Sequence, residues 1–157
     1  MREILFRGKS AEDGKWFTGQ LLHFKSPVSE KELNVVVEGC EWDDSNELFN
    51  IGRRAKVVPE TVGQYTGLTD KNGKKIFEGD MIKPFDDEID NMVVEFRHGQ
   101  FLLCLYGERG YMAEYGWEES RNYVCFEADP LLSYGDDIEV IGNIHDTPEP
   151  SRGDTNG

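Results

Sequence analysis

The sequence predicts a mainly β protein in which short strands and hairpins form a sandwich or a small barrel, with one or two short helical turns. Short apolar runs recur about every ten residues, which is the spacing typical of such folds. The 17 glycines among the 157 residues separate these runs instead of gathering in one linker. In addition, no window places apolar residues at the positions i, i+3, i+4 and i+7 that a long amphipathic helix needs.

Most of the predicted strands are runs of β-branched or aromatic side chains, which fit a pleated sheet. In chain order they are expected at Ile4–Phe6, Trp16-Phe17, Leu21-Leu22, Val35–Val37, Val57-Val58, Tyr65–Leu68, Lys75–Glu78, Asp80–Lys83, Val93–Phe96, Phe101–Tyr106, Tyr123–Phe126 and Ile138–Ile144.

Two short helical turns are expected between these strands. One is at Ser29–Leu33, where Ser29 and Glu32 have the spacing of a capping box. The other follows Asp129-Pro130, with the proline at the first helical position.

The clearest turn is Asn72-Gly73, between the expected strands Tyr65–Leu68 and Lys75–Glu78. Asn-Gly tolerates positive φ and matches the twist of two paired strands, so it predicts a tight hairpin. A second hairpin is expected at His98–Gln100. Asp80, which follows a glycine, is expected to be a turn residue whose side chain accepts backbone N–H bonds.

The length fits one domain, which we place at residues 1–146. The run Glu41–Glu47 is an acidic insert expected to form an exposed loop, as is the acidic run Asp86–Asp90. Residues 147–157 include two prolines and two glycines but no apolar side chain. They are expected to form a flexible tail because they have nothing to bury.

The charge of the chain and the length of its apolar runs argue against several classes of protein. With 17 Lys and Arg against 31 Asp and Glu, the net charge is −14, which disfavours direct binding of nucleic acid. No apolar run approaches the ~20 residues of a membrane-spanning helix, and Met1–Arg7 lacks the apolar core of a secretory signal. The densest basic cluster, Arg53–Lys56, is a candidate contact for an acidic loop of a neighbouring chain.

No local motif indicates catalysis, a cofactor or a metal. Cys40, Cys104 and Cys125 lie in or beside apolar runs and are expected to be buried free thiols. The three histidines, His23, His98 and His145, are isolated, and no pair of cysteines or histidines has the spacing of zinc ligands. No catalytic, cofactor-binding or metal-binding residue is therefore predicted, and a non-enzymatic role is favoured.

Three blocks resemble the YopX family of phage and prophage proteins: Arg2–Gly8 followed by Trp16, then Val58–Ile82, then Glu139–Asp146. The family-motif and turn positions in these blocks are Pro59, Glu60, Gly63, Gln64, Tyr65, Gly67, Asn72, Gly73, Gly79, Asp80, Gly142 and Asn143. The insert at 41–47 and the stretch between Phe101 and Pro130 depart from the family pattern. The resemblance implies a β-rich, oligomeric, phage-derived protein in a bacterial cytoplasm. It implies no activity and supplies no catalytic residues.

The six apolar residues Phe101–Tyr106 suggest a subunit interface. Side chains of a strand alternate between its two faces, so both faces of this strand must be covered. Tyrosine, tryptophan and methionine, which are enriched at interfaces, follow in the next segment. We predict a homo-oligomer with Phe101, Tyr106, Tyr111, Tyr115 and Trp117 as interface residues. The alternative is a strand buried on both sides within one subunit.

Three functions remain open. The first is a self-associating binding or assembly module that meets a host or phage protein. The second is an acidic decoy that binds a host protein built to hold nucleic acid. The third is an unrecognised enzyme whose site assembles only in the folded chain. A large apolar contact would favour the first, a continuous carboxylate stripe the second, and a cleft with perturbed titratable groups the third.

Overall fold

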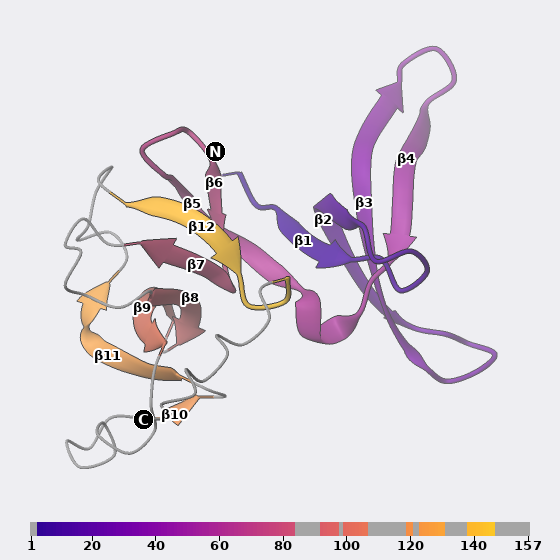
Figure 1. Ribbon diagram of the computed structural model, residues 1–157. Helices are drawn as coiled ribbons and strands as arrows, with labels where there is room; N and C mark the ends of the chain where they lie inside the picture. Colours follow the sequence, from indigo (N-terminus) through magenta and orange to yellow (C-terminus); the bar gives the residue numbers. More distant parts are fainter. Residues whose placement is uncertain are drawn as a thin grey trace, which may run out of the picture. The chain divides into compact units, whose positions relative to one another are not determined.

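A computed structural model describes residues 3–83, 92–97, 99–106, 119–120, 123–130 and 138–146 (Figure 1). The described chain contains one 3-10 helix, η1 (Pro59–Thr61). Its strands are β1 (Phe6–Lys9), β2 (Trp16–Lys25), β3 (Glu32–Asp43), β4 (Leu48–Lys56), β5 (Gly63–Thr69), β6 (Lys75–Phe77), β7 (Asp80–Lys83), β8 (Met92–Arg97), β9 (Gln100–Tyr106), β10 (Glu119–Ser120), β11 (Tyr123–Pro130) and β12 (Glu139–Asn143).

The strands form two six-stranded sheets. The order is β4-β3-β2-β1-β5-β6 in the first sheet and β10-β11-β9-β8-β7-β12 in the second. The expectation of a mainly β fold made of hairpins is confirmed. The barrel alternative is wrong for the described strands, because both sheets have open edges. Contacts divide the chain into two compact units, 1–67 and 68–157, with the boundary inside β5.

The first unit has a small core in which β2, β3 and β4 meet. Phe17, Val36, Ala55 and Val57 are buried there. The close approach of β2 to β3 requires a glycine at position 19, because a Cβ there would lie 1.8 Å from the Val37 carbonyl oxygen.

The second unit has apolar clusters built from alternate residues of β8 and β9. Val94 and Leu103 belong to one cluster, whereas Val93, Leu102 and Cys104 belong to another. Leu102, Leu103 and Cys104 are at most 1% exposed. At these three residues, both faces of β9 are therefore buried within one chain, which was the alternative to a subunit interface. The interface expected around Phe101–Trp117 stays a prediction.

The Asn72-Gly73 turn is confirmed. Gly73 has a φ of 78° and donates its N–H to the Asp70 carbonyl, while the Asp70 N–H reaches the Lys74 carbonyl. The two strands that it joins are β5 and β6. Of the Asn-Gly pair, only the glycine has positive φ.

Several local expectations are wrong. No helical turn forms at Ser29–Leu33: the amide of Ser29 donates to Ser26 Oγ, and β3 begins at Glu32. Val57 makes only an isolated bridge to Ser10, because β4 ends one residue earlier. Glu41–Asp43 of the acidic insert belong to β3 instead of a loop.

Other expectations concern segments that are only partly covered. Pro130 is the last residue of β11, and the segment expected to form a helix after it lies outside the described residues. The tail 147–157, the acidic run 86–90 and His98 also lie outside them. The single-domain boundary at residue 146 therefore stays a prediction.

The cysteine expectation is also corrected. Cys40 is free but exposed, because it lies in the distal part of β3. Cys104 is buried but disulfide-bonded. The register of β9 and β11 places Cys125 directly opposite Cys104.

Candidate interaction surface

The most exposed part of the first unit is the distal end of the β3–β4 hairpin. β2 pairs with β3 from Glu32 only as far as Val37, whereas β4 continues along β3 to Asp43. Beyond β2 the hairpin is therefore a ribbon of two strands, Glu38–Asp43 and Leu48–Arg53, which we call the arm. In Figure 1, β3 and β4 rise to their connecting loop with no other strand of their unit beside them.

Two glycines lie at the start of the arm. They fall between the cross-strand pairs Glu38–Arg53 and Cys40–Ile51. Gly39 has a φ of 71°, and a Cβ on Gly52 would lie 2.3 Å from the Glu38 carbonyl oxygen. Only glycine fits this close approach of two backbones, so the sequence allows the hairpin to continue past the sheet at this point.

The arm exposes large apolar side chains. Trp42 and Phe49 are directly opposite each other and are 58% and 59% exposed. The neighbouring pair on the same face is Cys40–Ile51, two residues away on each strand. Leu48, next to Phe49 along β4, is also exposed, on the other face of the strand. A two-stranded ribbon is marginal alone in water, and uncovered aromatic pairs of this kind mark interaction sites.

β4 is also an edge strand. It ends the order of the first sheet, and all of its nine residues except Ala55 are exposed. One side of a long edge strand carries backbone N–H and C=O groups that can pair with a further strand. The arm thus offers both an apolar face and a hydrogen-bonding edge.

Charge is segregated between the two ends of the β3–β4 hairpin, which we call the tip (residues 41–47) and the root (residues 53–56). The tip has the four carboxylates Glu41, Asp43, Asp44 and Glu47 and no basic residue, giving −4 over residues 41–47. The root, Arg53–Lys56, has three bases and no acid, giving +3. In the tip, the hydrogen bonds that the Asp43 carboxylate accepts, first from the Asn46 side chain and then from the Ser45 amide, lower its pKa.

The bases of the root differ in their contacts. Arg53 lies 3.6 Å from the Glu38 carboxylate and 5.1 Å over the ring of Phe17. Within the described part of the chain, neither Arg54 nor Lys56 forms an ion pair. These two cations are therefore available to an external anion.

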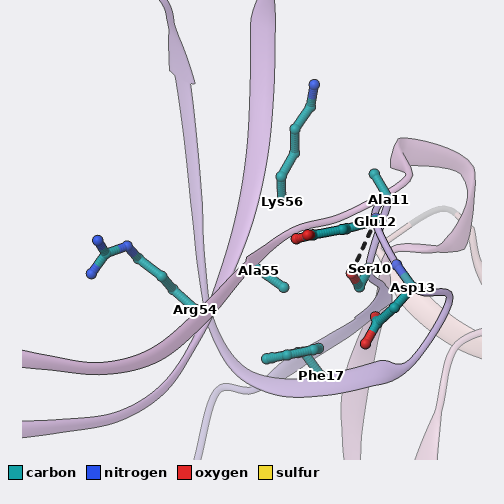
Figure 2. A pocket seen from close by; sticks show the side chains of 8 residues that line it. All are labelled: Ser10, Ala11, Glu12, Asp13, Phe17, Arg54, Ala55 and Lys56. Atoms are coloured by element: carbon teal, nitrogen blue, oxygen red, sulfur yellow. Dashed lines mark hydrogen bonds between the residues drawn. The ribbon is translucent and has the colours of Figure 1, made fainter.

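Arg54 and Lys56 border a hollow of about 450 Å³. Figure 2 shows its lining residues, which come from the β1–β2 turn, β2 and the root: Ser10, Ala11, Glu12, Asp13, Phe17, Arg54, Ala55 and Lys56. Its apolar part is Phe17 and Ala55, which are both buried.

The acidic side of the hollow belongs to the β1–β2 turn. Ser10 Oγ accepts the backbone N–H groups of Glu12 and Asp13. Asp13 pairs with Lys15 at 2.9 Å, and the hydrogen bond from Lys15 is the main cause that lowers the Asp13 pKa to about 2. In Figure 2 the guanidinium of Arg54 points away from Asp13. No histidine is among the lining residues, so the arrangement offers charge for docking instead of a base for a nucleophile.

The predicted family-motif residues mostly support strand pairing and turns. Pro59 and Glu60 lie in η1, and Gly63, Gln64, Tyr65 and Gly67 lie in β5. Gly142 and Asn143 pair with the start of β7, at Met81 and Asp80, so the central and terminal blocks meet there.

Two of the motif side chains act within turns. Asp80 Oδ2 accepts the N–H of Phe77 at 2.8 Å, as expected for a turn residue. Gly79, with a φ of 83°, accepts the N–H of Ile144 on its carbonyl. Asn143 Oδ1 accepts the amide of His145.

The predicted interface residues are only partly described. Phe101 is half-buried in β9, and Tyr106 ends that strand. Tyr111, Tyr115 and Trp117 lie outside the described residues. The arm was not predicted from the sequence as a candidate site.

Within the described residues, no three side chains of His, Cys, Asp or Glu are grouped to hold a metal ion. The described segments also include no helix with the length and apolar character needed to cross a membrane.

The YopX protein family matches residues 5–150, which is nearly the whole chain. The chain belongs to the YopX family. Among solved structures, this YopX-family chain is similar to protein EF1440 from Enterococcus faecalis, with 19% identity and a TM-score of 0.54 over 95% of this chain and 98% of that one. At that identity the likeness shows the fold alone. A search of curated proteins gives no match.

Proposed function

We propose that this YopX-family protein is a non-enzymatic module of phage or prophage origin that self-associates in the bacterial cytoplasm. In this role it builds an assembly that also meets a host or phage protein. The observation that carries the proposal is the arm, in which an exposed Trp42–Phe49 pair and an open edge strand occur together. A second copy of the chain supplies a matching apolar face and a matching edge.

The described residues give the other two functions less support. The carboxylates of the tip are confined to the end of β3 and the turn after it, and the bases of the root lie at the other end of β4, so they form no continuous acidic stripe within the described hairpin. The hollow at the root joins charged side chains, but Ser10 is already engaged by two backbone amides. The assembly role therefore has the only specific geometry in its favour among the described residues.

Sedimentation velocity at micromolar concentration tests the proposal. The wild type is expected to sediment as an oligomer, and the double variant Trp42→Ser, Phe49→Ser as a monomer, because it loses the aromatic pair. Phe24→Ser is the matched control, since Phe24 is 45% exposed on β2 outside the arm. This control should behave as the wild type does.

A monomeric wild type would refute self-association. An oligomeric arm variant would leave self-association standing and remove the arm from it. In that case the double variant Tyr111→Asp, Trp117→Asp tests the segment that the sequence indicated.

A further inference from the structure

We propose that two copies dock through their β4 edges in antiparallel orientation, so that the acidic tip of each arm contacts the basic root of the other. This inference rests on the proposed self-association and adds its surface, its orientation and its ionic contacts. The occupant of the arm is therefore a second copy of the same chain, placed head to tail.

The orientation follows first from symmetry. β4 runs from the tip, at Leu48, to the root, at Lys56. Two identical edge strands related by a two-fold axis perpendicular to the sheet must pair antiparallel. The Lys56 carbonyl already accepts the N–H of Ala11, so the open part of the β4 edge runs from Leu48 to Arg54. Antiparallel pairing of the two open edges places Ile51 near the axis and Leu48 opposite Arg54 of the second copy. The tip loop of the second copy then lies near Lys56 and the hollow at the root.

The charges favour the same orientation. An antiparallel arrangement sets the −4 of each tip against the +3 of the other root, and it does so twice. A parallel arrangement sets tip against tip and root against root, so that like charges face each other. At physiological salt the interaction between exposed charges falls off over about 8 Å, so only charges in close contact across the interface contribute strongly. Complementary and repulsive contacts together select the register and the orientation.

The groups that make these contacts are available. Arg54 and Lys56 form no ion pair within the described part of the chain, and in Figure 2 the Arg54 guanidinium points away from Asp13. In the tip, Asp44 and Glu47 are exposed. Asp43 is different, because its carboxylate oxygens are used by Ser45 and Asn46 to hold the turn. We therefore assign the intersubunit ion pairs to Asp44 and Glu47 against Arg54 and Lys56.

Two variants with reversed charges, one at the root and one at the tip, test the inference. The root variant carries Arg54→Glu and Lys56→Glu, and the tip variant carries Asp44→Lys and Glu47→Lys. Each variant alone brings like charges together in an antiparallel pair, and we expect its dissociation constant to rise at least about tenfold. In an equimolar mixture of the two variants both contacts become attractive again. Native mass spectrometry should then show a heterodimer whose dissociation constant is within about threefold of the wild-type value.

The control is Lys31→Glu, Lys74→Glu, which changes the net charge as much as the root variant does at exposed positions outside the arm. It should associate as the wild type does. Circular dichroism of every variant before mixing identifies any that fail to fold. A misfolded root variant is replaced by Arg54→Gln, Lys56→Gln, and a misfolded tip variant by Asp44→Asn, Glu47→Gln. Each of these neutral variants should associate more weakly than the wild type.

The outcomes separate the two proposals. A monomeric wild type refutes self-association itself. A wild type that associates while neither charge variant changes the association overturns only the antiparallel inference. Failure of the mixture to restore the dimer also overturns it. A root or tip variant that self-associates more tightly than the wild type indicates parallel arms, because each charge reversal then lowers the repulsion between like ends, and this result overturns the inference as well.

Discussion

Replacing Asp70 by asparagine should destabilise the second unit, because this buried carboxylate ties the β5–β6 turn to β12. Asp70 is 4% exposed. Its Oδ1 accepts the N–H groups of Asn72 and Lys74, both at 2.9 Å. Its Oδ2 accepts the N–H of Val140 at 3.0 Å. One side chain therefore satisfies three backbone donors in two segments that are distant in the sequence.

The magnitude follows from these bonds. Asparagine keeps the shape of the side chain but replaces one accepting oxygen with an NH₂ group, which faces a donor. The chain then loses at least the bond to Val140, which as a hydrogen bond to a charged group contributes about 1.5–3 kcal/mol. Asp70→Asn should therefore lower the free energy of unfolding by about 2 kcal/mol, and Asp70→Ala by more, since it leaves all three N–H groups without this acceptor.

The effect should depend on pH. Burial of Asp70 raises its pKa, but the N–H groups of Val140, Lys74 and Asn72 together outweigh this and hold the pKa below its usual value. A carboxylate with a depressed pKa in the folded state stabilises fully above the unfolded pKa near 3.9, and this contribution is lost as the pH falls through the folded pKa. The difference between wild type and Asp70→Asn should be largest near neutral pH and should shrink in acid.

Urea unfolding followed by far-UV circular dichroism measures this difference. All proteins should be compared at one concentration, because self-association would add to the apparent stability. Glu32→Gln, at the exposed start of β3 outside the arm, is the control and should leave the midpoint unchanged. A free energy of unfolding for Asp70→Asn within about 0.5 kcal/mol of the wild type near pH 7 would refute the reasoning.

Four further outcomes follow from the same structure. Gly52→Val should disturb the arm and abolish self-association in sedimentation, because its Cβ would lie 2.3 Å from the Glu38 carbonyl oxygen; an unchanged oligomer would contradict this. Gly73→Val should lower the melting temperature by about 2–4 °C for each kcal/mol lost, since a β-branched residue resists a φ of 78°; an unchanged melting curve would refute the turn geometry. Dithiothreitol should also lower the melting temperature, because reduction removes the disulfide of Cys104, and an equal melting temperature in both conditions would argue against it. A gel shift with DNA at physiological salt should show no micromolar binding, because a net charge of −14 repels phosphate; a shifted band at that concentration would contradict this.

The parts of the fold that the sequence predicts are those governed by local chemistry. The Asn72-Gly73 turn is one, since glycine takes positive φ without strain. The strand Asp80–Lys83 is another: its bounds match β7, and Asp80 accepts a backbone N–H as a turn residue does. In both cases the decisive interactions lie within a few residues along the chain.

The parts that the sequence missed depend on pairing between distant segments. Leu48–Lys56 includes Asn50, Gly52 and three bases, a composition with little intrinsic preference for a strand. It becomes one because β3 lies beside it, from Val35–Lys56 to Asp43–Leu48. The disulfide bond of Cys104 was missed for a similar reason, since it depends on the register between β9 and β11.

The arm, too, could not be predicted as a candidate site from its own sequence. Cys40 and Trp42 alternate with polar residues on one strand, as do Phe49 and Ile51 on the other. That alternation is the signal of a ribbon with one apolar face. The acidic residues around Trp42 suggested a solvated loop instead, because a charge run is usually a solvated surface. The pairing of Trp42 with Phe49 shows that this segment is a strand, as the alternation indicates. Both side chains are nevertheless exposed, as the charge run indicates.

A solvated arm whose only purpose was solubility would need no aromatic pair at its distal end. Trp42 and Phe49 are more than half exposed there, at a place where no further strand of their unit covers them. The hairpin also fixes where the charges lie: because β3 and β4 are antiparallel, the acidic turn and the basic end of β4 must lie at opposite ends of the same ribbon. A segment of sixteen residues, from Glu41 to Lys56, thus combines an apolar face, an open edge and a charge gradient that distinguishes the two directions of docking. Each of these features occurs on ordinary surfaces alone, but on one ribbon the edge and the charges together favour contact between two copies in antiparallel orientation, and the apolar face adds area that such a contact can extend over.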